Sequence, residues 1–493
     1  MNLSKSKYCR GLQCKKILWL EKNKPEEKQE INNESIMETG NHIHEIAKYI
    51  FGNHINIEYT ENLSQMIEDT MNTIDSYKDI IITEASFTYK NNFCSVDILK
   101  KNNNSYEIYE IKSSTELKDI YINDASYQYY VLTNLGLKVT KVSLVHINRE
   151  YVRKGDLDLE QLFKIQDITK EVKDLQNDVE KNIKEINNYL EKKEQPKDID
   201  ENCFEPYLCP FFKYCTRHLP EKNIFNIAGM HKETKLKLYK EGLYDYKDLV
   251  NSNINEKYKK IIEYELYNKE DYIDKTALKE FLNKLKKPIY FLDFETFQQP
   301  IPLYDNISPY EKIPFQYSLH YIDKDLKHKE FLAEAGTDPR RALAEQLIKD
   351  IPKDVTTLAY NMGFEKGVIK RLSKLYPDLS EHLLNIRDNI KDLMVPFRQK
   401  KYYTKDMHGS YSIKYVLPAL FPDDPSLNYK NLDLVHNGIE AMSSFEDLIG
   451  KTGKEKEYIR ERLLRYCELD TYAMVKIYEK ILEVVKETKW KKK

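Results

Sequence analysis

The amino-acid sequence predicts an α/β protein with two sheet-containing parts and a shorter helical stretch between them. Near the N-terminus, the runs IITEASFTYK, NNFCSVDILK and YEIYEIKSS have the period-two alternation and the β-branched or aromatic content typical of strands. After residue 287, the runs KPIYFLDFET, FQYSLHYI and VTTLAYN have the same character. Apolar residues at helical spacing fill the segments that separate and follow these strands, so each part is expected to combine a sheet with helices.

Composition limits the class of protein. Of the 493 residues, 41% are hydrophobic and 32% are charged, which is ordinary for a globular protein. The sequence contains no run of about 18 apolar residues, so we expect neither a transmembrane helix nor a membrane partner. The N-terminus lacks the apolar stretch and the small-residue cleavage site of a secretory signal, and we therefore expect a cytoplasmic protein.

The charge balance excludes one class of nucleic-acid-binding protein. The 78 basic and 80 acidic side chains give a net charge of −2, which is incompatible with a uniformly basic protein that coats nucleic acid. Enzymes that act on nucleic acid confine their positive charge to a groove and use carboxylates to bind metal ions. An enzyme of that kind is therefore compatible with the composition.

The character of the sequence changes twice, and three regions are expected. Residues 1–222 contain the first strands, a charged segment from 159 to 193 that we predict as a helix or a helix pair, and a cysteine-rich end. Residues 223–286 are helical and punctuated by glycine, which fits either a helix-hairpin-helix-like module that contacts phosphates or a helical linker. Residues 287–493 form a second α/β region, and Pro288 precedes its first strand.

A first group of polar residues falls on the N-terminal strands. Glu110 and Lys112 lie two residues apart, so a strand places them on one face and Ile111 on the other. Asp97 lies on the preceding strand, which antiparallel pairing can bring beside them. Two carboxylates suit a hard divalent ion such as Mg²⁺ or Mn²⁺, and a lysine beside them can orient water and stabilise charge at phosphorus.

The order of polar residues around this group resembles a nuclease family. That order is Gly40-x-x-x-His44, Glu84, Asp97, Glu110-x-Lys112 and then Gln128. It resembles the RecB-like branch of the PD-(D/E)XK nucleases, especially the iron–sulfur type found among CRISPR-associated exonucleases. The resemblance covers about residues 5–218 and implies a restriction-endonuclease-like fold. It implies that His44, Asp97 and Glu110 bind the metal, that Lys112 is the catalytic lysine, and that Gln128 supports the site from a helix.

The stretch ENCFEPYLCPFFKYCTRH contains three of the seven cysteines at two equal gaps of five residues. In a reducing compartment, clustered thiols such as Cys203, Cys209 and Cys215 are better explained as metal ligands than as disulfides. The same nuclease branch carries a [4Fe–4S] cluster held by one N-terminal and three C-terminal cysteines. The resemblance therefore implies Cys14, in GLQCKKILWL, as the fourth ligand.

Two alternatives to the cluster stay open. Zinc could bind the three C-terminal cysteines together with His218 and need no N-terminal ligand, or the thiols could hold no metal. Cys94, inside a predicted strand, and Cys467, near the C-terminus, are expected to be small buried side chains.

A second group of acidic residues falls in the C-terminal region. In YFLDFETF, strand periodicity puts Asp293 and Glu295 on one face, where they could share two metal ions. LAYNMGFEK supplies Glu365. RYCELDTYAMV places Tyr466 and Asp470 one helical turn apart.

This second group resembles the DEDD exonucleases of the RNase H-like fold, in the DnaQ-like group. The resemblance implies that Asp293, Glu295, Glu365 and Asp470 bind the metal ions and that Tyr466 orients the attacking water. The family normally has aspartate where this chain has Glu365, which keeps the charge and lengthens the side chain. Asp392, in IKDLM, matches a further landmark that we interpret as structural.

The pairing of these two regions in one chain resembles a bacterial family described as a domain of unknown function, and the resemblance extends along the whole chain. The resemblances imply a metal-dependent nuclease with two phosphodiesterase centres, for which single-stranded DNA ends are the favoured substrate. Two other functions stay open: a nucleic-acid-binding adaptor in which one or both centres are inactive, and a 3′–5′ exonuclease that acts on RNA. The sequence does not identify which proteins, if any, bind to it.

Overall fold

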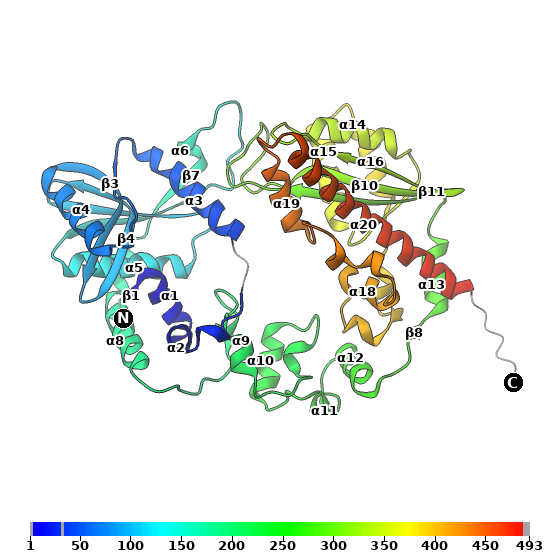
Figure 1. The fold of residues 1–493 in the computed structure, drawn as a ribbon, viewed down its shortest axis with the longest axis horizontal. Helices are drawn as coiled ribbons and strands as arrows, with labels where there is room; N and C mark the ends of the chain where they lie inside the picture. The colour runs from blue at the N-terminus through cyan, green and yellow to red at the C-terminus, as the bar shows by residue number, and fades with distance from the viewer. Residues whose placement is uncertain (1–2, 31–33, 487–493) are drawn as a thin grey trace. The chain divides into compact units, whose positions relative to one another are not determined.

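The computed structural model describes residues 3–30 and 34–486, and for residues 34–39 the backbone alone. The chain forms two compact units (Figure 1). Unit 1 comprises Met1–Leu219 and Gln299–Glu311, and unit 2 comprises Pro220–Gln298 and Lys312–Lys493. Each unit combines helices with a sheet and has its own hydrophobic core, which confirms the predicted α/β class.

Unit 1 is built on a mixed sheet with the strand order β2-β3-β4-β5-β6-β7, and β1 pairs with β4. The central strands β3, β4 and β5 pair antiparallel, whereas β5 and β6 run parallel and are joined through α5. The strands are β1 (Leu3–Ser4), β2 (Ile55–Asn56), β3 (Asp79–Tyr89), β4 (Asn92–Asn102), β5 (Ser105–Lys112), β6 (Lys138–Ile147) and β7 (Phe163–Asp167). The helices are α1 (Lys5–Gln13), α2 (Lys15–Asn23), α3 (Glu34–Lys48), α4 (Leu63–Ser76), α5 (Asp119–Asn134), α6 (Leu159–Leu162), α7 (Thr169–Asp174), α8 (Gln176–Leu190) and α9 (Phe212–Thr216).

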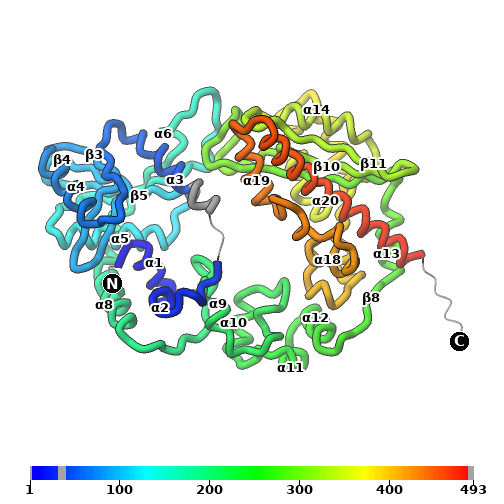
Figure 2. The backbone as a smooth tube through the Cα atoms, in the orientation of Figure 1, coloured from blue at the N-terminus to red at the C-terminus, as the bar shows by residue number. Residues whose placement is uncertain are grey.

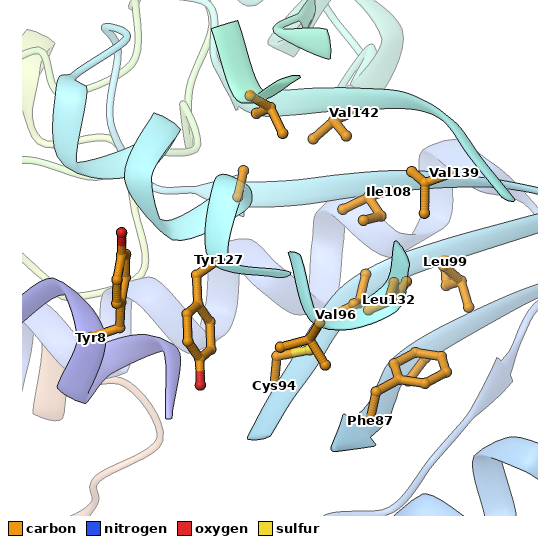
Figure 3. Close-up of a cluster of buried hydrophobic side chains, with 14 of the residues drawn as sticks. Tyr8, Phe87, Cys94, Val96, Leu99, Ile108, Tyr127, Leu132, Val139 and Val142 are labelled. Carbon is orange, nitrogen blue, oxygen red and sulfur yellow. The ribbon is translucent and has the colours of Figure 1, made fainter. Parts of the chain in front are cut away.

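The main core of unit 1 fastens α1 to the sheet. Tyr8 of α1 stacks on Tyr127 of α5 with ring centroids 4.9 Å apart, and both side chains are fully buried. Figure 3 shows the two rings beside Cys94 and Val96 of β4, so Cys94 is a core residue as predicted. The Tyr127 hydroxyl donates a hydrogen bond to the carbonyl of Leu3. The N-terminal strand and helix are thus held against the strands that carry the first group of polar residues.

The segment that joins β9 to β10 along the chain belongs to unit 1. The backbone N–H of Arg153 donates to the carbonyl of Ile307 at 3.1 Å, and that of Asn306 donates to the carbonyl of Arg153 at 2.9 Å. Ile301 and Tyr310 pack into a second core of unit 1. The chain therefore leaves unit 2 after β9, completes unit 1, and returns to form β10.

Unit 2 contains a sheet with the strand order β11-β10-β9-β12-β13. Strands β9, β10 and β11 are antiparallel neighbours, whereas β12 and β13 run parallel to β9. The strands of unit 2 are β8 (Tyr272–Ile273), β9 (Ile289–Phe297), β10 (Ile313–Asp323), β11 (Asp325–Leu332), β12 (Thr356–Ala359), β13 (Ile390–Asp392) and β14 (Tyr402–Tyr403). The helices are α10 (Lys232–Lys240), α11 (Tyr246–Leu249), α12 (Glu256–Tyr267), α13 (Lys275–Asn283), α14 (Arg340–Asp350), α15 (Gly363–Leu375), α16 (Ser380–Asn389), α17 (Val395–Arg398), α18 (Ile413–Leu420), α19 (Gly438–Asp447) and α20 (Gly453–Lys486).

The two faces of this sheet are covered by different helices. Leu292, Phe294 and Tyr317 lie on one face and pack with α14, α15 and α16. The opposite face contains Asp293 and Glu295 and is covered by the long helix α20, which runs along the sheet (Figure 2). Strand periodicity therefore places both acids between the sheet and α20.

Most of the predicted elements are present, and two differ. The six predicted strands correspond to β3, β4, β5, β9, β10 and β12, and the C-terminal helix corresponds to α20. The prediction of a helix or a helix pair over residues 159–193 is wrong in part, because Phe163–Asp167 forms β7 and pairs with β6 at the edge of the sheet. The sequence also gave no sign of β11, which is highly charged and is held by antiparallel pairing with β10.

The region from 223 to 286 is helical, as expected, and lies within unit 2 rather than standing apart. Strand β8 pairs with β14, and the N–H of Asp274 donates to the carbonyl of Lys401 at 2.8 Å. Gly409 has a φ of +75° and lies against Ile261, where a Cβ atom would meet the isoleucine at 2.8 Å. These contacts bind the helices to the C-terminal region.

Candidate functional site

The first group of polar residues comes together in unit 1, where β4, β5 and α5 each contribute. We call Asp97, Glu110, Lys112, Asp124 and Gln128 the unit 1 centre. Lys112 Nζ lies 2.6 Å from Glu110 Oε1, as their shared strand face predicts. The Gln128 amide donates to Glu110 Oε2 at 2.6 Å, and the backbone N–H of Ile111 donates to Asp97 Oδ2 at 2.7 Å. Asp97, Glu110 and Gln128 are buried, so these hydrogen bonds hold their side chains in place.

Asp124 of this centre, and Lys5 beside it, were not predicted. Lys5, in the first turn of α1, donates to Asp97 Oδ1 and to Glu110 Oε1, both at 3.1 Å. Asp124 lies one helical turn before Gln128 and accepts from Lys112 Nζ at 2.7 Å. The spacing of Asp124 and Gln128 on α5 could have indicated a shared face. Lys5 is 92 residues from Asp97 in sequence, and no local pattern connects them.

His44 and Glu84 flank Asp97 on its other side. His44 Nε2 lies 3.4 Å from Asp97 Oδ2, and one ligand atom each from His44, Glu84 and Asp97 lie within 4.8 Å of one another. Glu84 has a left-handed backbone (φ +59°), which is unusual for a residue within a strand and aims its side chain toward this group. The structure thus gathers the predicted ligands His44 and Asp97 with Glu84, whereas Glu110 is engaged by Lys5 and Lys112.

The electrostatics of the unit 1 centre favour charged side chains. Burial alone would raise the pKa of Asp97, but the positive charges of Lys5, His44 and Lys112 outweigh burial and lower it. Burial and Asp97 likewise act to raise the pKa of Glu110, and Lys112 and Lys5 reverse the effect. Burial opposes the charge on Lys112, yet Asp124 and Glu110 raise its pKa. The carboxylates are therefore ionised, and lysine side chains neutralise them.

A cavity of about 310 Å³ adjoins this centre. Its lining includes Lys112 and Asp124 from the centre, Tyr121 from α5, and Arg10 and Gln13 from α1. Lys112 Nζ lies 5.6 Å from the centroid of the Tyr121 ring. Basic, aromatic and amide side chains thus line the approach to the carboxylates.

The second predicted group comes together in unit 2. We call Asp293, Glu295, Glu365, Tyr466 and Asp470 the unit 2 centre. Asp293 and Glu295 project from β9, Glu365 comes from the first turn of α15, and Tyr466 and Asp470 face them from α20. Glu295, Glu365 and Tyr466 are buried. Asp392 accepts hydrogen bonds at 3.0 Å from the backbone N–H groups of Asn361 and Met394, which fits the structural role predicted for it.

The acids of the unit 2 centre repel one another. Burial raises the pKa of Asp293 well above its ordinary value, and the charges of Asp470, Glu295 and Glu365 add to the rise. Burial and Asp470 raise the pKa of Glu295 as well, against the opposing charge of Lys414. Burial raises the pKa of Asp470 to about 6 and that of Glu365 to about 8. Among the described residues, no lysine forms an ion pair with these carboxyl groups, whereas Lys5 and Lys112 pair with the acids of unit 1.

The unit 2 centre also contains a buried carboxylate oxygen without a hydrogen-bond partner among the described residues. This oxygen is Oε2 of Glu365. A buried polar atom without a partner is costly, and in native proteins it commonly indicates an ion or a ligand. Four carboxyl groups with an unsatisfied oxygen match the all-oxygen coordination that Mg²⁺ and Mn²⁺ prefer, so the residues of the unit 2 centre fit such ions.

Two further residues touch the unit 2 centre. The Tyr429 hydroxyl, which was not predicted, donates to Asp470 Oδ1 at 2.6 Å. Its ring lies 6.3 Å from that of Tyr466, centroid to centroid. Cys467 is fully buried as expected, and its Sγ approaches the carbonyl of Asp293 at 3.8 Å.

The predicted cysteine ligands also come together, in unit 1. Cys14, Cys209 and Cys215 share one small apolar cluster, and Cys203 is linked to it by the hydrogen bond from the N–H of Cys209 to the Cys203 carbonyl. Gln13, next to Cys14, donates to the carbonyls of Asn202 and Tyr207 at 2.8 and 2.7 Å. Burial raises the pKa of Cys203 to about 11 and that of Cys209 to about 12, and the neighbouring thiols contribute. Segments from the N-terminal end and from the end of the first part of unit 1 are thus joined around four thiols.

The spacing of these thiols bears on the choice of metal. Tetrahedral zinc with bonds of about 2.3 Å would hold its sulfur ligands less than 4 Å apart. In the part of the chain that the structure describes, no three of the cysteines lie within 4.8 Å of one another, and His218 is exposed and joins no group of ligand atoms. A four-iron cluster binds each thiolate through a different iron and needs wider spacing.

Comparisons with known proteins identify relatives without a described function. Residues 290–412 match the family model described as a domain of unknown function (DUF2779). The chain is 28% identical over 226 residues to the uncharacterized protein MG366 of Mycoplasma genitalium, a match that spans 42% of this chain and 33% of the relative. It is 26% identical over 272 residues to the uncharacterized protein UU173 of Ureaplasma parvum, spanning 50% of this chain and 38% of the relative. No solved structure matches the chain.

These matches cover only part of this chain and only part of each relative. The matched part of the chain spans little more than a third of the length of these curated relatives. The family model includes Asp293, Glu295 and Glu365 but ends before α20 and its Asp470. Among residues 3–30 and 34–486, no helix is both long enough and apolar enough to cross a membrane.

Proposed function

We propose that the protein is a metal-dependent nuclease with two phosphodiesterase centres. The observation that carries this proposal is the unit 2 centre, where four carboxyl groups converge, two of them buried and two half-buried. Their pKa values are raised by burial and mutual repulsion, and one oxygen has no hydrogen-bond partner among the described residues. Such a cluster is unfavourable without cations and favourable with two divalent ions. Binding of two Mg²⁺ or Mn²⁺ ions would satisfy it.

The proposed chemistry of the unit 2 centre is hydrolysis at the 3′ end of a strand. When bound, the metal ions supply Lewis acidity for the phosphate and for the attacking water. Asp293, Glu295, Glu365 and Asp470 would hold them, and Tyr466 is placed to orient the water. Tyr429 fixes the rotamer of Asp470 through its 2.6 Å hydrogen bond.

The unit 1 centre supports a second hydrolytic site. Lys112 is held between Glu110 and Asp124 at 2.6 and 2.7 Å, so its ammonium is positioned rather than free to rotate. A positioned, charged lysine stabilises the charge that develops on a phosphate during hydrolysis. His44, Asp97 and Glu84 would hold a metal ion beside it.

The fold supports the two family resemblances. In unit 2, the order β11-β10-β9-β12-β13, with antiparallel strands followed by parallel ones and acids on the first strand, is the arrangement expected of an RNase H-like exonuclease. In unit 1, the acids and the lysine lie on β4 and β5 with Gln128 on the next helix, as expected of a RecB-like PD-(D/E)XK nuclease. We propose these two folds and a [4Fe–4S] cluster at Cys14, Cys203, Cys209 and Cys215.

Labelled substrates test the proposal. Purified protein is incubated with Mn²⁺ and with 5′- or 3′-labelled single-stranded DNA and RNA, beside the variants Lys112→Ala and Asp293→Ala. We expect degradation of single-stranded DNA ends, with part of the activity lost in each variant. Degradation of RNA alone would assign the substrate to RNA. An absence of cleavage with both labels would refute the enzyme and leave an adaptor that binds nucleic acid.

The cofactor is tested separately. Protein purified without oxygen is expected to absorb near 400 nm because of sulfur-to-iron charge transfer, and Cys209→Ser should lose that absorption. A colourless protein that contains zinc would refute the cluster.

A further inference from the structure

A third group of potential metal ligands lies in unit 2, outside the acidic centre. His320 on β10 and His328 on β11 lie directly opposite each other in the antiparallel register, and their ring centroids are 4.4 Å apart. Glu468 faces them from α20. One ligand atom from each of the three side chains lies within 4.8 Å of the other two.

Hydrogen bonds orient both imidazole rings. His320 Nδ1 lies 2.8 Å from Thr471 Oγ1, and His328 Nε2 lies 2.8 Å from Ser318 Oγ. The two hydroxyl groups are 2.6 Å apart, and the Thr471 hydroxyl donates to the Glu468 carbonyl. Because Thr471 has a single hydroxyl proton, it accepts from Ser318 and His320, and Ser318 in turn accepts from His328.

This chain of donors fixes one tautomer for each histidine. The bonded nitrogens, Nδ1 of His320 and Nε2 of His328, carry the protons. The other nitrogen of each ring therefore presents a lone pair. A hydrogen bond from the second ring nitrogen to a polar group is what orients metal-binding histidines and sets their tautomer.

The surroundings leave space for a ligand. A cavity of about 250 Å³ is lined by His320 and Glu468, together with Arg465 and Tyr472. His320 itself is only 4% exposed and reaches the cavity from its floor. Among the described residues, no hydrogen bond or ion pair engages the Glu468 carboxylate, so it remains available as a ligand.

We propose that His320, His328 and Glu468 form a binding site for a zinc-like divalent transition metal. Two imidazole nitrogens and one carboxylate suit such a metal, whereas Mg²⁺ prefers an all-oxygen site. Bonds of about 2.0 to 2.2 Å would place the ligand atoms about 3.4 Å apart, so small side-chain movements would close the site. Three protein ligands leave a fourth position open toward the cavity, where water or an anionic group held by Arg465 could bind.

Zinc content tests this site independently of nuclease activity. Wild-type protein and the variants His328→Ala and Glu468→Gln are dialysed against Zn²⁺, and bound zinc is measured by mass spectrometry. All three proteins retain every cysteine and every acid of the unit 2 centre, so zinc bound elsewhere contributes equally. We expect about one equivalent less zinc in each variant. Equal zinc content in the three proteins would refute the site.

Two more variants separate the site from general effects. His436 pairs with Glu440 at 2.8 Å in the same unit, but among the described residues it belongs to no group of three potential metal ligands. His436→Ala should therefore keep the zinc content of the wild type. Ser318→Ala removes the hydroxyl that orients His328 and should weaken zinc binding roughly 10-fold, measured by titration. Wild-type affinity in Ser318→Ala would contradict the hydrogen-bonded arrangement, and a loss in His436→Ala would contradict the location.

Discussion

Replacement of Lys5 by methionine tests how the unit 1 centre is held together. Lys5 Nζ lies 3.1 Å from an oxygen of Asp97 and 3.1 Å from an oxygen of Glu110, and both carboxylates are buried. At an effective dielectric constant of about 20, each contact corresponds to about 5 kcal/mol of attraction. Much of this attraction offsets the cost of taking the ammonium out of water. The larger effect of the substitution is to leave two buried carboxylates, Asp97 and Glu110, with less positive charge beside them.

Removal of one partner from a buried ion pair typically costs about 3 to 5 kcal/mol. We expect Lys5→Met to lower the free energy of unfolding by about 3 kcal/mol, at the low end of this range. The Lys5 side chain is 23% exposed to solvent, and Lys112 still contacts Glu110 in the variant. The place it vacates lies between two carboxylates, where a divalent ion can bind. Added Mn²⁺ should therefore restore most of the stability of the variant.

The assay is urea unfolding followed by circular dichroism, with EDTA or with Mn²⁺. Lys15→Met is the matched control, because Lys15 pairs with Glu185 on the surface and its loss should cost less than about 1 kcal/mol under either condition. If Lys5→Met is as stable as the wild type in EDTA, the carboxylates do not depend on Lys5. If it is destabilised equally with and without Mn²⁺, no cation replaces the lysine.

Three further predictions concern other parts of the chain. Glu365→Gln should raise the melting temperature measured in EDTA at pH 8, because it removes one of several acids that repel one another. The same variant should be stabilised less by Mn²⁺ than the wild type. A lower melting temperature of the variant in EDTA would contradict this prediction. Burial acts to raise the pKa of Glu194, but Lys24, Lys16 and Tyr214 lower it to about 2, so its contribution to stability is complete above about pH 4.5 and is lost as the pH falls toward 2. Because this carboxylate is partly exposed to solvent, which screens its ion pairs, we expect Glu194→Gln to cost about 1 kcal/mol at pH 7 and nothing at pH 2, measured by urea unfolding at both pH values. Tyr429→Phe should reduce the rate of 3′-end cleavage by the unit 2 centre while leaving the fold intact, and an unchanged rate would show that the hydrogen bond to Asp470 has no role in positioning.

The parts of both centres that could be predicted are those set by local periodicity. Glu110 and Lys112 share a strand face, as do Asp293 and Glu295, and Tyr466 and Asp470 share a helix face. These arrangements follow from the two-residue repeat of a strand and the 3.6-residue repeat of a helix.

The parts that could not be predicted depend on contacts between distant segments. Lys5 reaches Asp97 because Tyr8 and Tyr127 fasten α1 to α5, and no pattern near Lys5 indicates that packing. Tyr429 meets Asp470 from a short 3-10 helix (Tyr429–Asn431) 41 residues earlier in the chain. The charged strand β11 has little intrinsic tendency to form a strand and exists because β10 offers it a paired edge.

The return of the chain from unit 2 to unit 1 and back affects how the protein can be divided. Unit 1 lacks its last segment until residue 311 has been synthesised, after β9 of unit 2. A fragment that ends at residue 222 would lose Ile301 and Tyr310 and leave an uncovered apolar surface beside Ile111, in the strand that carries Lys112. Unit 1 is therefore not a module that gene truncation or recombination can transfer as one continuous piece, and folding of the two units is coupled through the order of synthesis.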